Sequence, residues 1–173
     1  MPNPDFEKLV RKFAEQQQKE AAQAAVDWHE RKTWWIKRVR QLFDQIGVWL
    51  QPLIESGVVQ FKRSMMPAHE ENIGPYDIEW LELRVVEKKL TFLPVGTLLL
   101  RASGRIDASG PTGDISLVLI EADTTELPQE RRAQATWFIR HPSLPVPRSR
   151  SDLRPLNEST FEELFADLFG IPR

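Results

Sequence analysis

The order of apolar and polar residues divides the chain into a helical part followed by a part with the alternation of β-strands. Residues 5–46 contain no proline or glycine and are rich in Ala, Gln, Glu, Lys and Arg, the composition of a strong helix former. Asn3 is a suitable N-cap for this segment. Gly47 and Pro52 then interrupt the pattern. The pattern predicts one long helix, or two joined helices, over about residues 4–55.

Two apolar stripes lie on the predicted helix. The first has helical spacing and consists of Phe6, Leu9, Val10 and Phe13. After a polar interruption at residues 16–20, alanines follow, which suit either exposure to solvent or a close approach of two helices. The second stripe alternates spacings of four and three residues, as a heptad seam does: Ala21, Ala25, Trp28, Lys32, Trp35, Val39, Leu42, Ile46, Trp49 and Leu53.

Two hypotheses explain the second stripe. In one, the helix lies across the sheet of its own chain and the tryptophans are core, since helices in proteins draw most of their stability from packing. In the other, part of the helix packs against a second copy or another protein. A helix of 40 residues would be about 60 Å long, more than a domain of this size is wide, so part of it must project, fold back or meet a partner. The candidate interface residues are Trp28, Trp34, Trp35, Val39, Leu42 and Trp49.

The remainder of the chain predicts an antiparallel meander and a terminal helix. The expected strands cover residues 58–62, 77–88, 90–93, 97–107, 114–121 and 133–140. The apolar face changes between Trp80 and Leu81, which predicts a bulge or a strongly curved strand. Turns or loops are expected at 65–75, 88–89, 108–113 and 123–132.

The end of the chain combines an irregular segment with a last helix. Residues 141–155 contain four prolines and three arginines, which favours a surface wrap over a polyproline ligand. Ser159–Glu162 matches a capping box, and Gly170 is a suitable helix end. The apolar face of this helix consists of Phe161, Leu164, Phe165 and Leu168.

The predicted fold class is therefore α+β. A long N-terminal helix or helix pair packs on a curved antiparallel sheet of five to six strands, and a short helix ends the chain. The expected organisation is a helical arm at residues 1–56 and a sheet domain with the C-terminal helix at residues 57–173.

Composition excludes several classes of protein. The net charge is −2, which gives no general case for nucleic-acid binding, and the absence of cysteine excludes thiol chemistry and Cys-ligated metals. The first residues do not resemble a signal peptide, and no uncharged apolar run approaches the roughly 18 residues of a membrane span. These features predict a soluble, cytoplasmic protein. The basic, tryptophan-containing segment 28–40 is better explained as a solvated flank of a buried stripe than as a nucleic-acid or membrane contact.

The sequence contains no pattern that specifies catalysis. His29, His69 and His141 are not spaced as metal ligands, and the strained elbow of serine hydrolases is absent. We therefore expect no catalytic, metal or cofactor residues and favour a non-catalytic protein. A minor hypothesis places a small-ligand pocket at the concave mouth of the sheet, although the same residues could form cross-strand charge pairs beside a core aromatic: Trp80, Glu82, Arg84, Arg101 and Trp137.

Two functions follow as expectations. The first is a non-catalytic module for protein–protein interaction or self-association through the N-terminal amphipathic helix. The alternative is a small-ligand-binding protein or enzyme that uses the concave face of the sheet. The sequence itself specifies no partner and no substrate.

Overall fold

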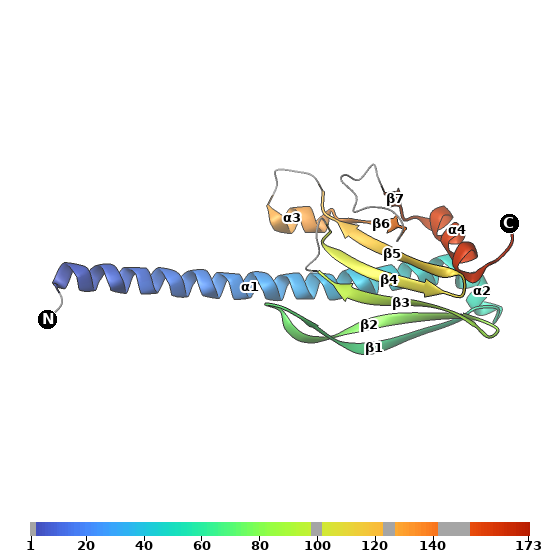
Figure 1. Cartoon of the computed structure of the whole chain (residues 1–173), viewed down its shortest axis with the longest axis horizontal. Helices are drawn as coiled ribbons and strands as arrows, with labels where there is room; N and C mark the ends of the chain where they lie inside the picture. Colours follow the sequence, from blue (N-terminus) through green and yellow to red (C-terminus); the bar gives the residue numbers. More distant parts are fainter. Residues whose placement is uncertain (1–2, 98–101, 123–126, 142–152) are drawn as a thin grey trace.

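The protein has an α+β fold in which two helices cover one face of an antiparallel sheet (Figure 1). The structure is a computed structural model and describes residues 3–97, 102–122, 127–141 and 153–173. The helices are α1 (Pro4–Trp49), α2 (Gln51–Glu55), α3 (Pro128–Ala133) and α4 (Glu158–Phe169). The strands are β1 (Gln60–Glu70), β2 (Gly74–Val85), β3 (Lys88–Gly96), β4 (Gly104–Gly110), β5 (Gly113–Ile120), β6 (Thr136–Arg140) and β7 (Arg154–Pro155).

The sheet is a meander of seven strands among the described residues. The strands follow one another in chain order, and each is antiparallel to the next, as the short connections predict. Five to six strands were expected. The additional strand is β7, two residues long, which pairs with β6 at the end of the proline-rich segment. A two-residue strand beside several prolines is difficult to predict from sequence, because prolines lack the backbone N–H that pairing with a neighbouring strand needs.

The long N-terminal helix begins and ends where the sequence predicts. The Asn3 side chain accepts a hydrogen bond from the Asp5 backbone N–H (3.0 Å), and Pro4 occupies the first turn. The helix continues through Gly47 to Trp49, and α2 follows after one residue with Pro52 in its first turn. Helix is therefore confirmed over about residues 4–55, and of the two predicted forms the chain adopts two joined helices.

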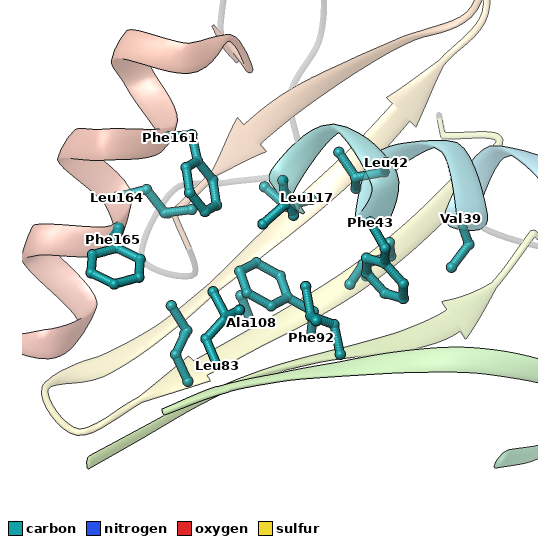
Figure 2. Packing of buried hydrophobic residues seen from close by; sticks show 14 of the residues in the cluster. Val39, Leu42, Phe43, Leu83, Phe92, Ala108, Leu117, Phe161, Leu164 and Phe165 are labelled. Carbon is teal, nitrogen blue, oxygen red and sulfur yellow. The ribbon is translucent and has the colours of Figure 1, made fainter. Parts of the chain in front are cut away.

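The core lies between the sheet and the two covering helices. Figure 2 shows Val39, Leu42 and Phe43 of α1 and three residues of α4 pointing toward side chains of the strands. The predicted apolar face of the last helix is buried in this core: Phe161, Leu164, Phe165 and Leu168. A smaller cluster of Val118, Phe138 and Leu153 lies on the opposite side of β5, so this strand is covered on both faces.

The expected loop at residues 65–75 is wrong. β1 continues to Glu70, and only three residues separate it from β2. Pro67 lies within β1 and is paired with Asp77. A proline is tolerated there because β1 is the edge strand, where the missing N–H costs no ladder bond.

Of the two alternatives expected for residues 77–88, the bulge is wrong. The pairing of β2 with β1 and with β3 runs without a register shift. The buried positions nevertheless change from Ile78 to Leu81 and Leu83, which cannot share one face of a flat strand. The β1–β2 pair therefore accommodates the change of face by twisting. The register shift lies in β3 instead, between Pro94 and Gly96.

Three further boundaries differ from the expectations. The turn expected at residues 88–89 lies at Val86–Glu87, where Val86 has a positive φ of 56°. The expected loop 123–132 contains the start of α3. The cap of α4 is Asn157, whose side chain accepts from the Thr160 N–H (3.0 Å) while the Thr160 hydroxyl accepts from the Asn157 N–H (2.8 Å). Asn and Thr can make the same reciprocal bonds as the expected Ser159–Glu162 pair.

Two expectations lie wholly or partly outside the described residues. The strand expected at residues 97–107 is described only at residue 97 and from residue 102 onward, and β4 begins at Gly104. The surface wrap expected for residues 141–155 is described only at its two ends.

Candidate functional site

The first half of α1 projects beyond the sheet as an arm. Every residue from Asn3 to Asp27 is exposed, and no other element lies beside this part of the helix (Figure 1). We call residues 4–27 the arm; its length is about 36 Å at 1.5 Å per residue. Its apolar stripe is exposed to solvent: Phe6 59%, Leu9 67%, Val10 48% and Phe13 63%. An apolar stripe of this kind on a helix normally faces other protein.

The arm begins with local interactions that favour helix. Glu7 lies in the first turn, where the helix dipole stabilises an anion, and it forms an i,i+4 ion pair with Arg11 (2.6 Å). Both side chains are at least half exposed, so the pair contributes little more than a few tenths of a kcal/mol. These interactions support the helix but do not cover its apolar stripe.

A buried polar cluster holds α1 where it leaves the sheet. The Arg31 guanidinium donates to the Thr97 carbonyl oxygen. The Thr97 N–H and hydroxyl donate to Glu70 Oε1 at 2.6 and 2.9 Å, and the Tyr76 hydroxyl donates to Glu70 Oε2 at 2.6 Å. We call these four residues the root cluster. It connects α1 with β1, β2 and the residue after β3.

The electrostatics of the root cluster agree with a structural role. Burial lowers the pKa of Arg31, and the nearby Glu121 carboxylate opposes that shift. Burial also raises the pKa of Tyr76, and the hydrogen bond to Glu70 raises it further. The tyrosine therefore stays neutral and serves as a hydrogen-bond donor. Gly96 leaves space for the carboxylate, because a Cβ at this position would lie 2.7 Å from Glu70 Oε1.

Three of the predicted interface residues are inside the chain's own core. Trp35, Val39 and Leu42 are buried between α1 and the sheet, so they offer no surface to a partner in this conformation. Trp35 packs directly on the backbone of β4, because a Cβ at Gly104 would lie 2.2 Å from Trp35 Cζ3. This packing fixes the base of the arm against the centre of the sheet.

The other three predicted interface residues are half-buried. Trp28 lies at the base of the arm, with the Arg31 guanidinium 5.8 Å from its ring centre. The Trp34 indole N–H donates to the Arg132 carbonyl oxygen of α3 at 3.1 Å. Trp49 packs against Phe161 of α4, with ring centres 5.3 Å apart. Of these three, Trp28 lies beside the exposed arm.

A groove of about 680 Å³ lies between α1, β6, β7 and the start of α4. Its apolar walls include Leu42, Trp49 and Trp137, which brings together two predicted interface residues and one predicted pocket residue. Arg38 lies in the same wall and is half-buried. One of its Nη atoms donates to the Ala135 carbonyl oxygen (2.6 Å), while its Nε has no hydrogen-bond partner. Burial lowers the pKa of Arg38.

The structure does not bring the predicted pocket residues together. Trp80, Glu82 and Arg84 are on β2, and three strands separate them from Trp137 on β6. Glu82 forms ion pairs with Arg84 (3.6 Å) and with Lys89 of the neighbouring strand (3.7 Å), as the alternative interpretation expects. Arg101 lies outside the described residues.

Two features of the site do not follow from the sequence patterns. The arm stripe Phe6–Phe13 has a helical pattern, but the tryptophan seam is longer and richer in large apolar residues, so the pattern favours the seam as the interface. The root cluster was not predicted, because Glu70 fell in an expected loop. The signal that the sequence offers is Glu70 itself, which continues the two-residue alternation of a strand and lies six residues before Tyr76.

Other kinds of site have no support among the residues that the structure describes. No group of three or more histidine, aspartate or glutamate side chains there is arranged to hold a metal ion. No helix in the described ranges is both long and apolar enough to cross a membrane. Comparison of the chain with protein families, curated proteins and solved structures finds no match.

Proposed function

We propose that the protein is a non-catalytic interaction module that binds another protein chain, a second copy included, through the apolar stripe of its arm. One observation carries the proposal. Four large apolar side chains are exposed on one face of a helix segment that no described part of the chain covers. The expectation that the protein acts in the cytoplasm stays part of this proposal.

Helix energetics support the proposal. Helices in proteins draw most of their stability from tertiary packing, and the described residues provide none for the arm. The arm also contains Val10 and two phenylalanines, which have lower helix propensity than alanine. Covering the stripe with protein would bury apolar surface and thereby stabilise the helix.

The test compares an arm variant with a matched control on the same helix. Leu9→Gln/Phe13→Gln removes two side chains of the stripe, whereas Val48→Gln changes an equally exposed apolar residue (61%) outside the arm. Sedimentation velocity from about 1 to 500 µM measures self-association, and affinity capture with the purified chain as bait measures other partners. The proposal predicts binding that the double variant weakens about tenfold or more and Val48→Gln leaves unchanged. Binding that both variants leave unchanged, or no binding in either assay, would refute it.

The groove supports a second candidate function, the binding of a small apolar ligand with an anionic group. The helix packs on the core-facing side of the sheet, and the groove beside it offers space for such a ligand. Its volume lies in the range of small-molecule sites. Arg38 lines the groove, and a guanidinium is suited to a carboxylate, while Trp49 and Trp137 provide apolar contact.

Dodecanoate is a suitable probe for this candidate. Titration calorimetry should detect binding to the wild type and a loss of about tenfold or more in Arg38→Gln. Lys37→Gln is the matched control, since Lys37 is an exposed cation one residue away and does not line the groove. Equal binding by both variants, or no binding, excludes this candidate.

A further inference from the structure

The face of the arm that carries the apolar stripe continues to the base of the helix in a symmetric pattern. Its positions are Phe6, Val10, Phe13, Gln17, Ala21, Ala24 and Trp28, separated by steps of 4, 3, 4, 4, 3 and 4 residues. An 11-residue repeat of this kind stays on one face of a straight helix. The order of steps reads the same in both directions from Gln17.

The two halves of this face differ in side-chain size. The half before Gln17 carries large apolar residues, and the half after it carries Ala21 and Ala24 before ending at Trp28. Two arms that cross antiparallel at Gln17 would place Val10 opposite Ala24 and Phe13 opposite Ala21. Large side chains would then meet small ones, which lets two helices approach closely and interdigitate. A parallel pair would instead set phenylalanine against phenylalanine and alanine against alanine.

We infer that the partner of the arm is a second copy of this chain, bound antiparallel about a two-fold axis at Gln17. The inference rests on the proposed function and names its partner. Phe6 of each chain meets Trp28 of the other, and the two Gln17 side chains face each other at the centre. A polar residue at the centre of such a pair fixes its register.

The shape of the molecule permits this arrangement. The sheet begins to contact α1 only near Trp28 and Arg31, and the arm before them has no neighbour (Figure 1). An antiparallel partner arm of equal length therefore ends where the sheet begins. The two sheets lie at opposite ends of the paired arms, about 36 Å apart, and do not collide.

The surface available agrees with a weak, reversible dimer. From the exposed fractions of the four large side chains, each arm would bury roughly 450 Å² of apolar surface. With their polar flanks, the two arms together would bury about 1,200 Å² of accessible surface, which is the lower end for specific interfaces. We therefore expect association at micromolar or higher concentration.

Single cysteines test the geometry directly, because the chain contains no cysteine of its own. The variants are Gln17→Cys, Val10→Cys and Ala24→Cys, each oxidised mildly at high protein concentration. Gln17→Cys should form a disulfide-linked dimer at least about tenfold faster than the other two alone, since two Val10 positions would be about 21 Å apart along the antiparallel pair. A mixture of Val10→Cys and Ala24→Cys should cross-link efficiently.

The outcomes separate this inference from the proposed function. Equal self-linking of Val10→Cys and Gln17→Cys indicates a parallel pair and overturns the inference, while the arm remains an interaction surface. The inference is also overturned if the wild type stays monomeric but captures another protein that the Leu9→Gln/Phe13→Gln variant no longer binds. In that case too the arm remains an interaction surface. Co-sedimentation with anionic lipid vesicles and no self-association would assign the stripe to a membrane surface and overturn both.

Discussion

Adding a methyl group at Gly104 should destabilise the protein strongly. A Cβ there would lie 2.2 Å from Trp35 Cζ3 and 2.8 Å from Cε3, and the indole is fully buried. Trp35 has little room to move, since its ring centre is 6.1 Å from that of Trp137. Overpacking of this kind costs up to about 3 kcal/mol, and partial displacement of a core tryptophan adds to it. We expect Gly104→Ala to lower the free energy of unfolding by about 3 kcal/mol.

Thermal and urea unfolding followed by circular dichroism measure this loss. For a chain of this length, 3 kcal/mol corresponds to a decrease in Tm of roughly 6–12 °C. Gly47→Ala is the matched control, because its Cβ would lie 3.5 Å from Phe61 Cζ, an ordinary contact, within a helix. It should be more stable than the wild type by about 0.5–1 kcal/mol. A Gly104→Ala protein within 0.5 kcal/mol of the wild type would refute the described packing of Trp35 on β4.

Three further substitutions or titrations test other parts of the structure. Val86→Asn should stabilise the protein by about 1 kcal/mol in urea unfolding, because Val86 is exposed with a φ of 56°, which asparagine tolerates better. Glu70→Ala should cost about 2–3 kcal/mol in the same assay, since Thr97 and Tyr76 lose their acceptor; a neutral result would contradict the root cluster. Tyr76 is the only tyrosine, and its pKa is raised, so absorbance at 295 nm should show no phenolate near pH 10 in the folded protein. Stability should fall above about pH 10, where the unfolded chain releases this proton and the folded chain keeps it, and Tyr76→Phe should remove that part of the slope.

The helices could be predicted from sequence because their signals are local. Asn3 with Pro4 marks a start, Gly170 adopts the left-handed conformation expected at the end of α4, and the apolar face of α4 repeats at helical spacing. Each signal depends on residues within one or two turns. The meander could also be predicted, since short connections leave antiparallel pairing as the only geometry.

The β1–β2 hairpin and the root cluster could not be predicted, since they depend on position in the sheet. Pro67 suits a strand only because β1 is an edge, and the sequence does not reveal strand order. Glu70, Thr97 and Arg31 meet only after three elements have packed together. Local patterns contain no information about such long-range contacts.

The seam on α1 shows the same limit for the site. Its spacing predicted burial correctly for Trp35 and Val39 but could not tell whether the chain's own sheet or a partner covers them. The chain's own core covers the seam from Trp35 to Ile46, whereas the arm stripe before it stays exposed. The length of the sheet along the helix decides this division, and helical spacing does not encode it.

Amide hydrogen exchange in the arm tests the central claim most directly. The measurement follows the amides of residues 8–27 at about 5 µM and about 500 µM protein, with the core amides of α4 as an internal reference. If protein covers the arm, its exchange slows as the concentration rises or as a captured partner is added, and the Leu9→Gln/Phe13→Gln variant abolishes that slowing. Exchange that is unaffected by concentration and by any captured partner, and equally fast in the variant, would contradict the claim that the stripe is a protein-binding surface.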